Sequence, residues 1–472
     1  MYSTVVDRSV TNRTIHPYVV LAVFCWLSFF FRPLLPVDET RYLSVAWEMF
    51  LQKSFFVPTL NFEPYFQKPP LLFWLIEFSW IILGVSRAAA ICVIFVISSL
   101  VLYFTRRLAL CLFPDDSRVG DLSPWVMLGS IPFIIYSTLV LFDLLLTLCV
   151  LIFTLMTMHF ARSGQWRDAV IAGVCVGLGV LAKGPVVLIH AAPVILFHPL
   201  WKTTTSPIST HRIFLGTAIS VAVGFMLVLA WLLPAFYETG FDFAYNLIWR
   251  QSAGRIAGSI EGAHARPFYF YLLLLPILLL PWILTRDFWR AIKADFRATS
   301  ISGSERRNLL FLTIWTVFII LAFSMISGKQ PHYIVPVVPA IVILFSFFLR
   351  RTSENWLQTI TYGTMLLFFV GQLIASFTIF KRFDLTPISL FITEHGSRDW
   401  AYMGNYQGEF TFLSRLQKPV SRIGLDEYPS WFSRHPDGYI VTKTRNDPPK
   451  GTRIIFQQPA DHGYFEILES SR

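Results

Sequence analysis

Residues 18–50, YVVLAVFCWLSFFFRPLLPVDETRYLSVAWEMF, set the pattern for the rest of the chain. An apolar run over 18–31 ends at a proline-containing turn, and the charged motif DETRY follows at 38–42. Arg8 and Arg13 precede the run, as in a secretory signal, but no small-residue cleavage site comes after it. We therefore interpret the run as a permanent membrane helix that delivers a charged motif to the far side of the bilayer.

The composition is typical of an integral membrane protein. Hydrophobic residues make up 54% of the 472 residues and charged residues only 14%, whereas about 25% of a soluble globular protein is charged. Apolar stretches of roughly 17–25 residues, the length that crosses a bilayer's hydrocarbon core, recur along most of the chain. The formal charge of +10 indicates basic cytoplasmic loops rather than a nucleic-acid partner, because no basic tail or nucleic-acid motif is present.

We predict eleven to thirteen membrane helices, with the N-terminus in the cytoplasm. The eleven clearest spans cover residues 18–31, 87–103, 125–136, 144–160, 169–181, 186–200, 213–233, 269–284, 309–326, 334–349 and 357–380. This arrangement puts the densest basic clusters on one side, as the positive-inside rule requires. The apolar segment 69–84 would move the later clusters to the wrong side if it crossed the membrane. We interpret it as a juxtamembrane or partly inserted helix.

The motif at 38–42 opens a predicted amphipathic helix. Apolar residues of 42–50 recur at the i, i+3, i+4, i+7 spacing of a helix, which we expect to lie along the outer membrane surface. Its first turn carries Asp38, Glu39 and Arg41. The alternative is structural: Asp38 would cap the helix, and Arg41 would extend toward the membrane surface.

Three further charged residues fall on the same predicted side. Lys68 precedes two prolines, which hold its backbone extended, so its ammonium could bind a phosphate. The alternative is an ordinary lysine at the membrane interface. Asp143 has apolar neighbours on both sides, and a carboxylate so close to hydrocarbon indicates function more than a helix cap. Lys183, before Gly184 and Pro185, either presents a cation at a helix end or belongs to a plain helix terminator.

Two later loops return to that side. The loop 245–266 carries Arg255 and His264 among small residues, which suits a lid over an anionic substrate. His264 fits an ordinary loop histidine as well as a metal ligand or an acid–base group. The turn SGKQPHY then contributes the cation of Lys329 and the ring of Tyr333.

In this order, the motifs resemble the GT-C glycosyltransferases of the bacterial aminoarabinose transferase and protein mannosyltransferase group. The resemblance rests on the DETRY run, the Lys-Pro-Pro-Leu run, Asp143, the Lys-Gly-Pro turn and the late Ser-Gly-Lys-x-x-x-Tyr turn, within residues 17–345. It implies an all-α polytopic membrane protein of GT-C type with extracytoplasmic juxtamembrane helices. It also implies an enzyme that transfers a sugar from a polyprenyl phosphate with inversion.

The same resemblance implies roles for individual residues. Asp38 would deprotonate or position the acceptor, and Asp143 would orient the acceptor or Lys68. Cations would hold the phosphate of the donor and stabilise the charge that develops on it. The residues expected to bind substrate are Glu39, Arg41, Tyr42, Lys68, Lys183, Arg255, His264, Lys329 and Tyr333.

A divalent metal is left open by the sequence, and no other cofactor is expected. The aminoarabinose transferase has a glutamate where this chain has Gln67, and that acid is associated with a metal site together with a histidine resembling His264. Gln67 is a poor ligand for a divalent cation. Glu63 and His264 are the remaining candidates.

The composition changes after Lys381. Residues 438–442 and 453–456 read as short strands, and 409–416 as a short helix. We predict a transmembrane catalytic domain at 1–384 and a small extracytoplasmic α/β domain at 385–472, which resembles the soluble C-terminal part of the aminoarabinose transferase.

The resulting expectation is a bacterial inner-membrane glycosyltransferase with a periplasmic site and C-terminal domain. Its donor would be an undecaprenyl-phosphate sugar, and its acceptor lipid A, lipopolysaccharide core or another envelope glycan. Protein O-mannosylation remains an alternative because it shares the first motif. A transporter or flippase for a lipid-linked substrate needs the same cations, but it would bind near the bilayer midplane, often within repeated halves. No such repeat is visible in the sequence.

Overall fold

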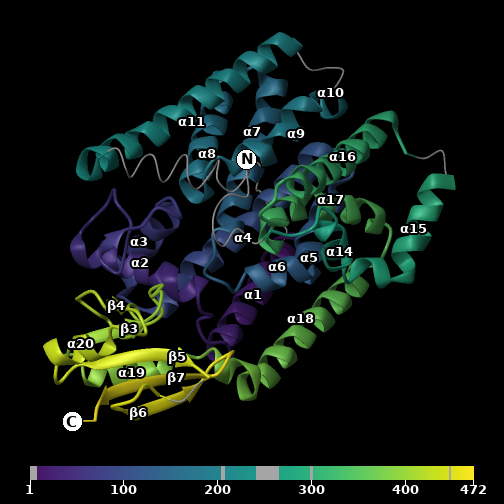
Figure 1. The fold of residues 1–472 in the computed structure, drawn as a ribbon. Coiled ribbons are helices and arrows are strands. Elements are labelled where there is room, and N and C mark those ends of the chain that lie inside the picture. The colour runs from purple at the N-terminus through teal and green to yellow at the C-terminus, as the bar shows by residue number, and fades with distance from the viewer. Residues whose placement is uncertain (1–7, 203–207, 241–264, 298–300, 446–447, 472) are drawn as a thin grey trace. The chain divides into compact units, whose positions relative to one another are not determined.

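A computed structural model describes residues 8–202, 208–240, 265–297, 301–445 and 448–471 (Figure 1). The chain forms two compact units. The first comprises Met1–Trp26, Phe66–Leu72 and Ile91–Phe368. The second comprises Leu27–Tyr65, Phe73–Ala90 and Phe369–Arg472.

Helices build the first unit. In chain order they are α1 (Arg8–Phe31), α4 (Arg87–Leu112), α5 (Ser117–Gly129), α6 (Ile131–Tyr136), α7 (Asp143–Ser163), α8 (Trp166–Lys183), α9 (Val186–Leu196), α10 (His198–Trp201), α11 (Thr210–Thr239), α14 (Phe270–Leu279), η2 (Trp282–Leu284), α15 (Arg286–Arg297), α16 (Gly303–Met325), η3 (Pro331–Val337), α17 (Val338–Leu349) and α18 (Glu354–Phe377). Three of them, α1, α4 and α18, extend into the second unit.

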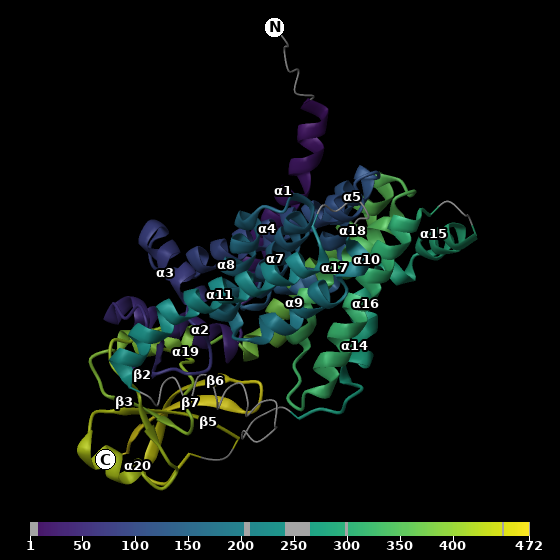
Figure 2. The same ribbon diagram turned by 90° about the horizontal axis from the view of Figure 1, so that it is seen from above.

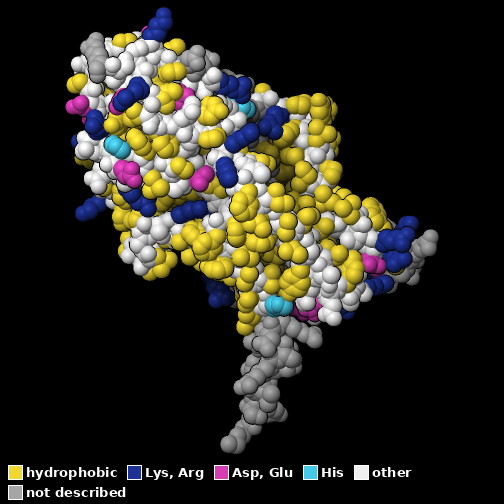
Figure 3. Space-filling view, turned by 90° about the horizontal axis from the view of Figure 1, so that it is seen from below, with side chains coloured by type: hydrophobic (Ala, Val, Ile, Leu, Met, Phe, Trp, Pro, Cys, Tyr) yellow, Lys and Arg dark blue, Asp and Glu magenta, His cyan; other side chains and the backbone are white. Residues whose placement is uncertain are grey.

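The chain is a multi-pass membrane protein. Within the described ranges, six helical segments are long and apolar enough to cross a bilayer: α4, α7, α11, α16, the continuous stretch Pro331–Leu349, and α18. The face shown in Figure 3 carries a broad, continuous hydrophobic surface, as expected for contact with lipid. The predicted total of eleven to thirteen spans stays a prediction.

All eleven predicted spans coincide with helical segments. Some are interrupted, and the predicted span 125–136 shows why. It divides into α5 and α6 at Ser130, whose backbone is extended, and Pro132 stands in the first turn of α6. The ambiguous segment 69–84 forms α3 (Leu71–Leu83), and 13 residues reach only about 20 Å, less than the hydrocarbon thickness of a bilayer.

Small residues bring α8 and α11 into close contact, and the two helices run side by side in both ribbon views (Figures 1 and 2). A Cβ atom at Gly173 would lie 2.6 Å from the carbonyl oxygen of Ser220, and one at Gly177 would lie 2.9 Å from that of Gly224. The Ser220 hydroxyl donates to the carbonyl of Ala169 at 2.7 Å. This contact, typical of membrane helices, holds the helix that ends at Lys183.

A five-stranded sheet dominates the second unit. Its strands are β3 (Trp400–Met403), β4 (Ser421–Ile423), β5 (Tyr439–Thr444), β6 (Thr452–Pro459) and β7 (Tyr464–Ser470), in the order β4-β3-β5-β7-β6. The pairs β3–β4 and β3–β5 are parallel, whereas β5–β7 and β6–β7 are antiparallel. Helices α19 (Thr386–Glu394) and α20 (Tyr428–Arg434) accompany the sheet. The two predicted strands are confirmed as β5 and β6.

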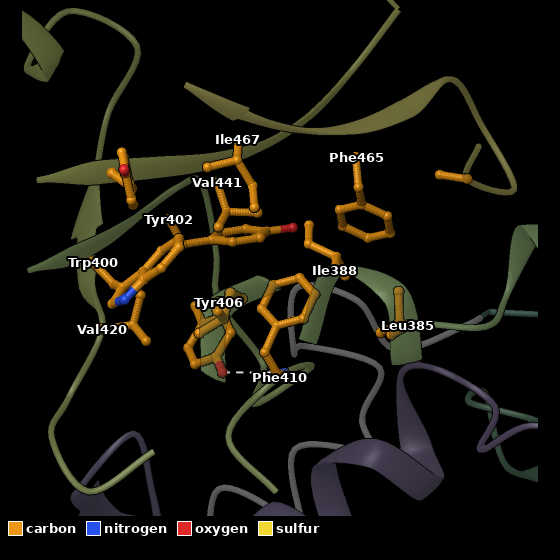
Figure 4. Packing of buried hydrophobic residues seen from close by; sticks show 13 residues of the cluster. Leu385, Ile388, Trp400, Tyr402, Tyr406, Phe410, Val420, Val441, Phe465 and Ile467 are labelled. Atoms are coloured by element: carbon orange, nitrogen blue, oxygen red, sulfur yellow. Dashed lines mark hydrogen bonds between the residues drawn. The ribbon is translucent and has the colours of Figure 1, made fainter. Parts of the chain in front are cut away.

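The predicted helix at 409–416 is wrong, because this segment forms turns. Its side chains fill the core beneath the sheet, where Tyr406, Phe410 and Phe465 lie close together (Figure 4). The backbone N–H of Phe410 donates to the Tyr406 hydroxyl at 3.2 Å. The segment closes at Arg415, whose φ of 53° is left-handed. Core packing has overridden the local helical pattern.

The second unit also contains α2 (Asp38–Gln52), β1 (Thr59–Leu60) and β2 (Glu63–Pro64). The predicted helix after the first span is confirmed as α2, but its surroundings differ from the expectation. The helix is hydrogen-bonded to the segment 408–416. The Ser44 hydroxyl donates to the carbonyl of Gly408 at 2.6 Å, and the Trp47 indole donates to the carbonyl of Leu416 at 2.9 Å. The turn segment therefore packs against α2, which we expected to lie along the outer membrane surface.

Candidate functional site

Asp143, Lys183 and Tyr333 come from separate motifs and meet in the first unit, and Lys68 lies beside Phe142, the neighbour of Asp143 in the chain. We call Lys68, Asp143, Lys183 and Tyr333 the lysine cluster. The Lys183 ammonium forms an ion pair with Asp143, and the two side chains are only 8% and 3% exposed. Lys183 Nζ lies 5.2 Å from the ring centroid of Tyr333, and Lys68 Nζ lies 6.0 Å from that of Phe142. The predicted convergence of the motifs is confirmed for Asp143 and Lys183, whereas the convergence of Asp38 and Lys68 with them stays a prediction.

Helix ends position the ion pair. Asp143 is the first residue of α7 and Lys183 is the last of α8, so the carboxylate lies at a helix N-terminus and the ammonium at a C-terminus. The helix dipoles favour both placements. Gly164, with φ of 69°, ends α7 and lets α8 return alongside it. This reversal brings Asp143 and Lys183 to the same end of the helix pair.

The cluster contains two lysines and one aspartate. Removing an ion pair from water is costly, so a buried pair is a weak source of stability and a common mark of a functional site. Asp143 offers one carboxylate, while Lys68 and Lys183 offer two ammonium groups. Two ammonium groups in this part of the unit suit an anion such as a phosphate.

His190 was missed by the sequence reasoning and lies beside this cluster. It is fully buried in α9, its ring centroid is 5.1 Å from that of Phe323, and it interacts electrostatically with Lys183 and Asp143. The Tyr333 ring lies 6.0 Å from the same Phe323. A lone histidine within the apolar run 186–196 was the available signal, since polar residues inside membrane helices are costly.

Lys329, predicted to bind substrate, instead holds a loop. Its side chain is buried and its ammonium donates to the carbonyl of Arg266 at 2.9 Å. Ala265 and Gly328 form an antiparallel bridge there. The predicted residues Arg255 and His264 lie outside the described part of the chain.

A second group lies in the second unit, at the first turn of α2. Asp38 pairs with Arg41, and their side chains are 51% and 15% exposed. The Tyr42 hydroxyl donates to Asp38 Oδ1 at 3.4 Å, and Arg41 Nη1 donates to Gln407 Oε1 at 3.2 Å. The Asp38 carboxylate is therefore accessible, whereas the guanidinium that neutralises it is held in place.

Glu39 has a different environment from its neighbour. Arg32 engages both of its carboxylate oxygens, with Nη2 to Oε1 at 3.0 Å, and the two side chains are 4% and 2% exposed. The Leu35 N–H donates to Glu39 Oε2 at 3.0 Å, and Arg87 donates to the carbonyl of Arg32. Glu39 was predicted to bind substrate, but its carboxylate fixes the turn before α2. Arg32 was missed, although it interrupts an apolar sequence.

Glu48 organises the hairpin that precedes the Lys-Pro-Pro-Leu run. Its buried carboxylate accepts hydrogen bonds from the backbone N–H of Asn61 at 2.8 Å and Phe62 at 2.7 Å. Both donors have left-handed φ, 54° and 63°. Burial raises the pKa of Glu48 to about 7, against the effect of these hydrogen bonds. The Asn61 side chain pairs with the backbone of Val420.

A metal site is not assembled by the residues described. No group of three His, Cys, Asp or Glu side chains able to hold a metal occurs among them. Glu63, one of the two candidates, is exposed and pairs with Arg422 at 3.1 Å.

Comparisons with known proteins agree with these motifs. The family model described as dolichyl-phosphate-mannose-protein mannosyltransferase matches residues 67–231. The undecaprenyl phosphate-alpha-4-amino-4-deoxy-L-arabinose arabinosyl transferase 1 of Pseudomonas fluorescens is 25% identical over 334 residues, which is 68% of this chain and 54% of that protein. A second such transferase of Pseudomonas fluorescens is 28% identical, over 71% of this chain and 56% of its own length. The chain thus spans little more than half the length of these curated relatives.

The fold extends the likeness over nearly the whole chain. The crystal structure of ArnT from Cupriavidus metallidurans bound to undecaprenyl phosphate matches with a TM-score of 0.77 at 16% identity, covering 97% of this chain and 98% of that one. The apo form matches with a TM-score of 0.78. The chain therefore has the fold of ArnT, and its similarity to the arabinosyl transferases supports the predicted resemblance to the aminoarabinose transferase group.

Proposed function

We propose that this protein is an inverting glycosyltransferase of the bacterial inner membrane. It transfers one sugar from an undecaprenyl-phosphate donor to an acceptor at the periplasmic side, such as lipid A, lipopolysaccharide core or another envelope glycan. The observation that carries the proposal is the buried Lys183–Asp143 pair at the ends of α8 and α7, with Lys68 beside Phe142. The relatives named above, which are arabinosyl transferases, support it.

The proposed reaction is a single displacement at the anomeric carbon. An acceptor hydroxyl loses its proton to a carboxylate, and its oxygen forms a bond to that carbon. The bond from the carbon to the phosphate oxygen breaks, and the electron pair leaves with undecaprenyl phosphate. Cations stabilise the charge that grows on this phosphate, and a positioned base accelerates proton removal by about 10²–10⁴-fold.

The environments of the two aspartates support different roles for them. Asp143 is buried and occupied by Lys183, so it positions that ammonium and is poorly available as a base. Asp38 is half exposed and lies at the start of a helix, where a substrate hydroxyl can reach it. We therefore assign Asp38 as the general base, with Lys68 and Lys183 as ligands of the donor phosphate. Arg41 pairs with Asp38 and is the third candidate ligand.

A transfer assay with purified full-length protein tests this proposal. Synthetic undecaprenyl-phosphate sugars are supplied with extracted envelope glycolipids, and both the product and the released undecaprenyl phosphate are measured. Asp38→Asn should lower the rate about 10²–10⁴-fold. Asp121→Asn is the matched control, because Asp121 is a similarly exposed carboxylate, 52%, paired with Arg106. Equal rates for Asp38→Asn and the wild type would remove Asp38 as the base.

Protein O-mannosylation is a second candidate, favoured by the family model that matches residues 67–231. It is distinguished in the same assay by replacing the glycolipid with serine- and threonine-containing peptides and the donor with a polyprenyl-phosphate mannose. Sugar on the peptide would select this alternative. A transporter would move the donor without consuming it, so any released undecaprenyl phosphate argues against transport.

A further inference from the structure

One face of α15 is docked firmly against α17 in the first unit. The ring of Phe288 packs against those of Phe345 and Phe348, with centroids 4.8 and 6.2 Å away. The buried carboxylate of Asp295 accepts hydrogen bonds from Arg350 at 2.7 and 3.2 Å. These two contacts lie on the same side of the helix, so its orientation is fixed.

The opposite face of α15 is basic. Arg286, Arg290 and Lys293 are spaced at i, i+4 and i+7, and all three are exposed. At about 100° per residue, this stripe points away from the docked side. Arg290 contacts Asp287 at 3.4 Å, while no ion pair engages Arg286 or Lys293 within the described part of the chain. Most of the stripe's charge is therefore available to an external anion.

Exposed apolar groups flank this basic stripe. Leu284 is 75% exposed and Trp289 is 51% exposed. The Trp289 indole donates to the carbonyl of Ile283 at 2.7 Å, which fixes the ring beside the cations. α15 follows the apolar helix α14 and precedes the membrane helix α16, and Figure 3 shows Lys and Arg gathered at the end where Figure 1 places α15, next to hydrophobic surface. Tryptophan is enriched where lipid headgroups meet hydrocarbon.

We propose that Arg286, Arg290 and Lys293, with Leu284 and Trp289, form a binding site for an anionic phospholipid. The cations contact the headgroup phosphate, and the two apolar side chains contact the glycerol and upper acyl region. The fixed, exposed indole beside the cations favours a lipid over a soluble phosphate, which has no apolar part to cover. The site does not depend on the proposed transfer reaction, and the positive-inside rule assigns it to the cytoplasmic leaflet.

Native mass spectrometry of the delipidated full-length protein tests this site. The protein is titrated with phosphatidylglycerol, cardiolipin and phosphatidylethanolamine. The wild type should retain the two anionic lipids in preference to phosphatidylethanolamine. The triple variant Arg286→Gln, Arg290→Gln, Lys293→Gln should bind them roughly a hundredfold more weakly, since each cation near an anionic lipid contributes about tenfold or less.

Two controls separate site loss from general effects. The triple variant Lys418→Gln, Arg434→Gln, Lys450→Gln removes the same charge from exposed positions of the second unit and should bind like the wild type. The variant Arg286→Lys, Arg290→Lys keeps the charge and should retain most of the affinity. The proposal is overturned if the α15 glutamine variant binds anionic lipid like the wild type, or if the control triple loses as much.

A variant of Trp289 distinguishes a lipid from a soluble anion. Trp289→Ala should weaken phosphatidylglycerol binding several-fold while it leaves the binding of inorganic phosphate unchanged. If inorganic phosphate displaces phosphatidylglycerol at equal concentration and Trp289→Ala has no effect, the occupant is a soluble anion and the assignment of a lipid is wrong.

Discussion

Breaking the Lys183–Asp143 pair should separate its structural cost from its functional role. Asp143→Asn leaves a buried ammonium without its carboxylate, and Lys183→Gln leaves a buried carboxylate without its ammonium. The side chains are 8% and 3% exposed, so solvent cannot compensate either loss. Removal of one partner of such a pair typically costs about 3–5 kcal/mol of stability.

The double variant Asp143→Asn, Lys183→Gln should recover most of that stability. Two neutral amides can hydrogen-bond to each other, and neither leaves an uncompensated charge. Because each single variant should lose about 3–5 kcal/mol and the double variant little, we expect a coupling free energy of roughly 5 kcal/mol, above the usual range for contacting residues. The matched pair Arg106–Asp121 is 28% and 52% exposed and should show about 0.2–1 kcal/mol in the same cycle.

Thermal unfolding in detergent and the transfer assay should be run on all four proteins of the cycle. Stability should fall in both single variants and return in the double variant, whereas transfer should stay low in every variant that lacks Lys183. An additive cycle would contradict the buried ion pair. A double variant with wild-type transfer would show that the Lys183 charge is not needed for the reaction.

Three further perturbations test the second unit, each by thermal unfolding. Glu39→Gln should cost about 3–5 kcal/mol because it leaves the buried Arg32 without a counter-charge, and an unchanged midpoint would contradict the structural role of Glu39. Burial raises the pKa of Glu48 to about 7, above its unfolded value near 4.5. Its contribution to stability, about 3 kcal/mol, is therefore complete below pH 4.5 and is lost as the pH rises through 7. Glu48→Gln should flatten this pH dependence of stability, and an equal slope in both proteins would refute the prediction. Gly408→Ala should destabilise the protein by about 1 kcal/mol or more beyond the loss caused by Gly451→Ala. Both glycines have left-handed φ, but only a Cβ atom at position 408 would collide, since it would lie 2.6 Å from Leu60. Equal losses in the two variants would contradict this contact.

Membrane helices were the most predictable part of the fold. Their apolar length is set by the bilayer, so every predicted span fell on helical structure. The interruptions were less visible, since a break such as the one at Ser130 depends on the following proline and on the partners that satisfy the free backbone groups. The segment 409–416 was mistaken for a helix because its periodic apolar residues face a core that only the sheet defines.

Asp143 and Lys183 were predictable because they stand between apolar segments, where a charge has few structural uses. Residues whose role depends on a long-range partner were not. In the sequence, Glu39 could not be distinguished from its neighbour Asp38, but in the structure it forms a buried ion pair with Arg32. The Lys329 ammonium likewise donates to the carbonyl of Arg266, a partner far from it in the sequence. Sequence spacing locates a charge along the chain, but the partner that it binds is set by tertiary packing.

The affinity for undecaprenyl phosphate, compared with undecaprenol, tests the central claim most directly. The two lipids share the chain and differ only in the phosphate that Lys68 and Lys183 are proposed to hold. The wild type should bind the phosphate at least a hundredfold more tightly, and Lys68→Gln, Lys183→Gln together should remove most of that preference. Equal affinity of the wild type for both lipids would contradict the claim that this protein recognises a lipid-linked phosphate.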